Sequence, residues 1–79
     1  MNINVRFNTT KDVGDFVNSA LTAPFDITAG EGRYIVDGKS VLGILSLDLS
    51  NPVKIEWEEF SDETAETAFM EKIKKFIVT

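Results

Sequence analysis

Hydrophobic and polar residues alternate at the start of the chain, from Asn2 to Asn8. Ile3, Val5 and Phe7 fall on one face of an extended segment, and polar side chains fall on the other. A period of two residues is typical of a β-strand with one buried face. The pattern therefore predicts a first strand over residues 2–8.

The spacing of the apolar residues becomes helical after a polar break at residues 9–12. Asp12 is a preferred residue type for a helix N-cap, so we expect the helix to begin there. Pro24 ends it, because proline cannot continue a helix. The expected apolar stripe of this first helix consists of Val13, Phe16, Val17, Ala20 and Leu21.

Two short apolar segments around a glycine-rich turn predict a β-hairpin. We expect strands over residues 25–29 and 33–36, joined by Gly30, Glu31 and Gly32. Asp37 and Gly38 then break the chain again. Ser40 is placed to cap a short second helix that continues through residue 47.

The last third of the chain predicts one more strand and a long terminal helix. Val53, Ile55 and Trp57 alternate with charged residues, which indicates a strand with one solvated face. Residues 61–63 then form a good helix start, with an N-cap and acidic side chains in the first turn. The expected apolar face of the terminal helix consists of Ala65, Ala68, Phe69, Ile73, Phe76 and Ile77.

The element order β-α-β-β-α-β-α predicts an α+β fold in two layers. Four strands with one apolar face each, and three helices with one apolar stripe each, are satisfied by an antiparallel sheet covered on one face by the helices. Residues 1–79 are expected to form a single domain. The order of the strands within the sheet does not follow from the pattern.

Composition excludes several kinds of chemistry. The 79 residues include no cysteine and no histidine, so the usual thiol nucleophile, the commonest general base and the commonest metal ligands are missing. We therefore expect no enzymatic activity, no metal site and no cofactor. An enzyme that works with carboxylates or lysine would need a concave pocket with clustered acids, for which this order of elements leaves little room.

The charge balance bears on partners and location. Thirteen acidic residues against eight basic ones give a net charge of −5, which disfavours direct binding to nucleic acid. No apolar segment is long enough to span a membrane, and the first five residues are too short and polar for a signal peptide. We expect a cytoplasmic protein that contacts other proteins.

Residues 39–47, Lys-Ser-Val-Leu-Gly-Ile-Leu-Ser-Leu, resemble the second helix of the HPr family. HPr is the phosphocarrier protein of the bacterial sugar phosphotransferase system. The shared pattern is Lys-Ser, an aliphatic pair, a glycine, a second aliphatic pair and Ser-Leu. The resemblance implies the open-faced β-sandwich of that family, in which the first and fourth strands are neighbours.

The same resemblance implies a role for Ser40, because many members of the family carry a regulatory phosphorylation site at the matching serine. A phosphate at a helix N-terminus is stabilised by free N–H groups and by the helix dipole. Serine is also simply a preferred N-cap residue, and this alternative requires no kinase. The sequence leaves both readings open.

The family docks its partners through residues that match Val41, Leu42 and Leu45, next to Lys39. Ile44 and Leu47 match positions that face inward. A short helix with five apolar residues cannot bury all of them on a one-sided sheet, so some of them are expected to be exposed. The resemblance predicts a partner-binding surface here, whereas the alternative is that all five belong to the core.

The family's active-site signature, Gly-(Ile or Leu)-His-Ala-Arg-Pro, should lie where the first strand leads into the first helix. The corresponding loop here is Thr9, Thr10, Lys11 and Asp12, which lacks the histidine, the arginine and the proline. The resemblance therefore implies a degenerate active-site loop that cannot carry phosphate on histidine.

The leading hypothesis is a non-catalytic HPr-like regulatory or protein-binding module. Its partner would be a component of the phosphotransferase system, a serine kinase or a transcriptional regulator. The alternative is a divergent protein of the same fold with an unrelated role, such as homo-oligomerisation through the exposed aliphatic helix. We expect a monomer or a weak homo-oligomer, with no membrane or direct nucleic-acid partner.

Overall fold

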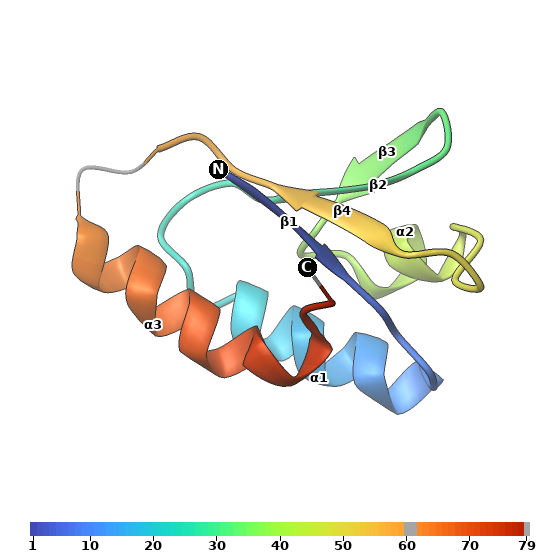
Figure 1. Ribbon diagram of the computed structural model, residues 1–79, viewed down its shortest axis with the longest axis horizontal. Coiled ribbons are helices and arrows are strands. Elements are labelled where there is room, and N and C mark those ends of the chain that lie inside the picture. The colour runs from blue at the N-terminus through green and yellow to red at the C-terminus, as the bar shows by residue number, and fades with distance from the viewer. Residues whose placement is uncertain (60–61, 79) are drawn as a thin grey trace.

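A computed structural model describes residues 1–59 and 62–78 (Figure 1). Helices and strands follow the predicted order, and a short 3₁₀ turn, η1, is added near the C-terminus. The elements are β1 (Asn2–Val5), α1 (Thr10–Ala20), β2 (Thr28–Glu31), β3 (Tyr34–Asp37), α2 (Val41–Leu45), β4 (Val53–Glu56), α3 (Glu63–Ile73) and η1 (Lys74–Phe76).

The four strands form one antiparallel sheet in the order β1-β4-β2-β3. Ile55 of β4 lies opposite Ile3 of β1 on one side and opposite Ala29 of β2 on the other. The pairing of the first and fourth strands, which the family resemblance implied, is confirmed. The sheet therefore places β1 at one edge and β3 at the other.

The helices cover one face of this sheet, as predicted (Figure 1). Helix α1 packs against both α2 and α3, and the core between helices and sheet is rich in aromatic rings. Phe69 of α3 meets Phe16 of α1, Phe25 and Trp57 at ring-centroid distances between 5.4 and 6.2 Å. Trp57 thus lies between the sheet and the terminal helix.

Strand boundaries differ from the prediction. The first strand was expected to reach Asn8 but ends at Val5, although Phe7 remains in the core. The second begins at Thr28 rather than at Phe25. The hairpin turn sets the ends of β2 and β3: Gly32 has a φ of +60°, Glu31 pairs with Tyr34, and Gly30 and Glu31 belong to β2 rather than to the predicted turn. Strand pairing thus starts later than the apolar pattern does.

Helices α2 and α3 are also shorter than predicted. Helix α2 ends at Leu45, and the terminal helix ends at Ile73, after which η1 and an extended segment follow. Asp62 is the N-cap of α3 and accepts from the amides of Thr64 and Ala65, whereas the expected contribution of Ser61 lies outside the described residues. Leu21 and Ala68, both expected on apolar stripes, are exposed.

The C-terminal segment covers the outer edge of β1. The amide of Val78 donates to the carbonyl of Asn4, and the amide of Arg6 donates to the carbonyl of Phe76, both at 2.9 Å. Val5 and Ile77 form an isolated antiparallel bridge between these contacts. Only backbone groups are needed for this contact, so it was not visible in the apolar pattern.

Candidate functional site

Ser40 caps α2, as the sequence predicted. Its backbone is extended, with φ −112° and ψ 115°, and its Oγ accepts a hydrogen bond from the amide of Gly43 at 3.0 Å. The Ser40 carbonyl accepts from the amide of Ile44. Ser40 is half-buried, so its hydroxyl both stabilises the helix start and lies at the molecular surface.

Gly43 has a steric reason to lie one turn after the cap. A Cβ atom at this position would lie 3.2 Å from Ser40 Oγ and 3.3 Å from the Cβ of Val36 in β3. Both distances are tighter than ordinary van der Waals contact. Gly43 therefore lets the start of α2 approach β3 closely. The packing gained in this way offsets the low helix propensity of glycine.

Lys39 connects α2 to the segment after α1. Its Nζ donates to the carbonyl of Ala23 at 3.0 Å, and its amide donates to Asp37 Oδ1 at 2.9 Å. These bonds give Lys39 a structural role that the sequence did not reveal. Its predicted part in partner binding stays a prediction.

The apolar residues of α2 divide between the core and the surface as expected. Ile44 is completely buried, and Leu47 nearly so. By contrast, Leu42 exposes 81% of its surface, and Val41 and Leu45 expose 38% each. We call the surface formed by Val41, Leu42 and Leu45 the α2 surface. The alternative that all five residues belong to the core is wrong.

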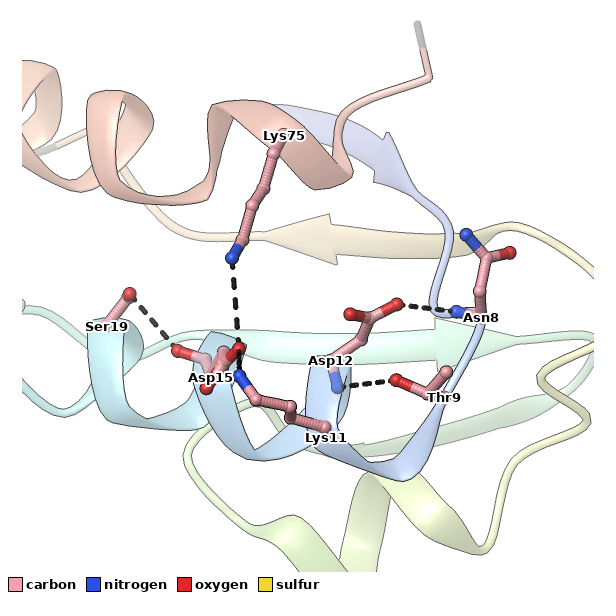
Figure 2. Close-up of polar contacts among 7 residues, drawn as sticks. All are labelled: Asn8, Thr9, Lys11, Asp12, Asp15, Ser19 and Lys75. Atoms are coloured by element: carbon pink, nitrogen blue, oxygen red, sulfur yellow. Dashed lines mark hydrogen bonds and ion pairs between the residues drawn. The ribbon is translucent and has the colours of Figure 1, made fainter.

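The stretch that matches the family's active site is a capped helix start rather than a loop. Figure 2 shows Thr9 Oγ1 accepting from the amide of Asp12 at 3.1 Å, while Asp12 Oδ2 accepts from the amide of Asn8 at 2.9 Å. Thr9 is therefore the N-cap, and Thr10, Lys11 and Asp12 form the first turn of α1. The expectation that Asp12 is the N-cap is wrong by three residues. Thr9 is the cap, and the Asp12 carboxylate accepts from the backbone amide of Asn8, just before the cap.

Asp15 binds two cations on the same side of the molecule (Figure 2). Its Oδ2 lies 2.9 Å from Lys11 Nζ and 3.8 Å from Lys75 Nζ. The hydrogen bond from Lys11, aided by the charges of both lysines, lowers the pKa of the Asp15 carboxyl. The pKa of Lys11 is raised, chiefly by the same hydrogen bond. The spacing of Lys11 and Asp15 predicts such a pair on a helix, but the approach of Lys75 needs the tertiary fold.

This arrangement is unsuited to holding a phosphoryl group. The Asp12 and Asp15 carboxylates lie in the first two turns of α1, where they would repel a phosphate. Both lysines near Asp15 are already paired with it. The residues at the start of α1 therefore stabilise a helix start, and both lysines beside Asp15 are paired with it.

A surface hollow of about 510 Å³ lies at the end of β4, beside the stacked rings of Phe25 and Trp57. It is lined by four acidic residues, Asp26, Glu56, Glu58 and Glu59. The fold thus leaves more room for clustered acids than we expected from the order of elements. All four carboxylates belong to exposed residues, which is the environment of ordinary surface acids.

Two further features concern the described residues. No group of acidic side chains in residues 1–59 and 62–78 is arranged to hold a metal ion. Within the same residues, no helix is both long and apolar enough to cross a bilayer.

The comparison with solved structures gives the fold a name. Seven chains match, among them the crystal structure of HPr-C-His from Thermoanaerobacter tengcongensis. This chain is 28% identical to it, with a TM-score of 0.72 over 95% of this chain and 90% of the other. No protein-family model and no curated protein matches the sequence. The chain therefore has the HPr fold.

Proposed function

We propose that this chain is a non-catalytic regulatory or protein-binding module, related to the phosphotransferase system, that engages a protein partner through the α2 surface. The observation that carries the proposal is the exposure of Leu42 beside the Ser40 cap, on a fold shared with HPr. A large exposed apolar side chain next to a surface hydroxyl suits a docking surface with a modification site.

The absence of histidine supports the non-catalytic part of this proposal. A phosphocarrier needs a nucleophile near a helix N-terminus and cations that stabilise the phosphoryl oxygens. At the start of α1 this chain instead has a threonine cap and the Asp12 and Asp15 carboxylates. These residues support a role in regulation or protein binding without phosphoryl transfer.

Ser40 is the proposed point of regulation. A phosphate on Ser40 Oγ would keep acceptor oxygens near the amide of Gly43, so the helix start would remain capped. The same phosphate would add negative charge beside Val41 and Leu42, so the apolar α2 surface would then have a charged group at its border. Modification would therefore alter the docking surface rather than unfold the helix.

The first test is phosphorylation by an HPr-type serine kinase with ATP, followed by intact-mass measurement. We expect one phosphate on the wild type and none on Ser40→Ala. Ser46→Ala is a matched control, because Ser46 lies at the other end of α2 and its hydroxyl donates to the carbonyl of Gly43. An unmodified wild type, beside an HPr that is phosphorylated in the same tube, would contradict the proposal.

The second test concerns docking and uses the same kinase as the partner. Leu42→Asp should raise the KM for this substrate roughly tenfold, because it places a charge at the centre of the contact. Leu21→Asp, at another exposed leucine, should leave KM unchanged. If Leu42→Asp instead abolishes self-association of the wild type in sedimentation velocity and leaves KM unchanged, the alternative of homo-oligomerisation through α2 replaces the docking proposal.

A further inference from the structure

One edge of the sheet is covered by backbone hydrogen bonds, and the other is open to pairing. The outer edge of β1 is covered by the C-terminal segment through the amides of Arg6 and Val78. Strand β3, Tyr34–Asp37, forms the other edge, and within the part of the chain that the structure describes no strand pairs with its outer side (Figure 1). Residues 34–36 are Tyr-Ile-Val, with no proline or lysine to discourage pairing with another strand.

The register of the hairpin shows which backbone groups of β3 point outward. Tyr34 and Val36 pair with Glu31 and Ala29 of β2, and the amide of Gly38 donates to the carbonyl of Ile27 at 2.8 Å. In an antiparallel ladder, alternate residues bond to the same neighbour. Residues 34, 36 and 38 therefore bond to β2, and the N–H and C=O of Ile35 point to the outer side.

We propose that a second copy of this chain pairs with β3 in antiparallel orientation, with Ile35 opposite Ile35 of the other copy. This register joins the N–H and C=O of the two Ile35 residues. It places Asp37, whose carbonyl also accepts from the amide of Ser40, opposite Arg33 in the turn of the other copy. A shift by a single residue would place inward-pointing groups opposite outward-pointing ones. The edge strand is self-complementary only in registers that keep this parity.

Charge complementarity selects the register centred on Ile35. Arg33 precedes the strand and Asp37 ends it, so each Arg33 lies opposite an Asp37 of the other copy. Asp37 Oδ1 already accepts from the amide of Lys39, so Oδ2 would accept from the guanidinium in this pairing. Two such ion pairs flank the central isoleucines on the open face of the sheet.

Apolar surface at the centre supports the same pairing. Ile35 exposes 72% of its surface and Tyr34 exposes 67%. The Ile35 side chain lies beside Gly30, and a Cβ atom added at Gly30 would lie 3.6 Å from Ile35 Cγ1. Because glycine has no side chain, no side chain of residue 30 covers Ile35 on the open face of the sheet. On the helix side of the sheet, Tyr34 would face Val36 of the other copy. Because the edge is short, we expect a weak dimer with a dissociation constant on the order of 0.1–1 mM.

Hydrogen exchange of the wild type tests the predicted pattern directly. On raising the protein concentration through this range, the amides of Ile35 and Asp37 should become protected. The amides of Tyr34 and Val36 already bond to β2 and should not change. Equal concentration dependence at all four amides, or none at any, would overturn the pairing.

A single engineered cysteine gives a second test, because the chain has no cysteine of its own. Residues opposite each other in a hydrogen-bonded antiparallel pair have Cα atoms about 5.5 Å apart, which a disulfide can span. Under oxidised glutathione, Ile35→Cys should form a covalent dimer at least about tenfold faster than Leu42→Cys, since proximity raises the effective concentration. Leu42 is the matched control because it is similarly exposed, at 81%. Cross-linking of Leu42→Cys at an equal or higher rate would overturn the proposal in favour of contact through α2.

Charge reversal tests the ion pairs without cross-linking. Arg33→Asp places two acids opposite each other, and Asp37→Arg places two arginines opposite each other, so each variant alone should lose the dimer in sedimentation velocity. An equimolar mixture of the two variants restores opposite charges in both pairs and should restore association. A mixture that associates no better than its components, or an Arg33→Asp variant that dimerises like the wild type, would overturn the assigned register.

Discussion

Asp15 illustrates how a single residue acquires its properties from both local and distant neighbours. Lys11 lies one helical turn before it, whereas Lys75 comes from the turn after α3. The pKa of Asp15 is lowered chiefly by the hydrogen bond from Lys11, with the charges of Lys11 and Lys75 adding to it against a desolvation effect. The carboxylate is therefore favoured more in the folded chain than in the unfolded chain.

Lys11→Met should raise the pKa of Asp15 toward its ordinary value, because it removes the largest cause of the shift. A carboxyl whose pKa is lowered on folding stabilises the fold above its unfolded pKa and loses this contribution as the pH falls through the folded pKa. The variant should therefore lose part of the acid dependence of stability below about pH 4. NMR titration of the Asp15 side chain measures the shift, and Lys75→Met should give a smaller one. An unchanged pKa in Lys11→Met would contradict the assignment.

At the scale of single elements, two glycines differ in whether the fold requires them. Gly14 lies inside α1, and a Cβ atom added there would meet nothing within 4 Å. Gly38 follows β3, and a Cβ there would lie 2.6 Å from Ile27 Cγ2 and 3.0 Å from the Ile27 carbonyl oxygen. Only the second glycine is required by a close approach of two backbone segments.

Gly14→Ala should raise the free energy of unfolding by up to about 1 kcal/mol, since alanine is the better helix former. Gly38→Ala should lower it by about 1–3 kcal/mol, because the backbone of Ile27 must move and its 2.8 Å bond from the Gly38 amide is disturbed. Urea unfolding followed by the fluorescence of Trp57, the single tryptophan, measures both changes. Destabilisation by Gly14→Ala would show that α1 has less room than its geometry indicates.

Element boundaries mark the limit of what the sequence predicts at this scale. The alternation in β4 and the Ser40 cap of α2 were predicted from local pattern and are confirmed. The start of β2 was not, because Phe25 and Ile27 are buried without being in a strand. Apolar periodicity reports which side chains are buried, whereas strand assignment requires a hydrogen-bonded neighbour whose register comes from elsewhere.

At the scale of the molecule, the two-layer architecture was predictable and the strand order was not. Four one-sided strands and three one-sided helices require two layers, but the adjacency of β1 and β4 entered only through the family resemblance. Exposure of Leu42 followed from the excess of apolar residues in a short helix, and the structure confirms it. The acidic hollow beside Phe25 and Trp57 was missed, because the segments that line it meet only in the folded sheet.

The covered edge of β1 gives the last prediction. Val78→Pro removes the amide that donates to the Asn4 carbonyl, and Ile77 already has the extended conformation that a following proline requires, with φ −71° and ψ 130°. The loss of one backbone bond should lower the free energy of unfolding by about 1 kcal/mol. Val78→Ala keeps the amide and is the matched control, and the side chain is half exposed, so its own effect should be smaller. Equal stabilities of the two variants would mean that side-chain packing, rather than the backbone bond, holds the C-terminal segment against β1.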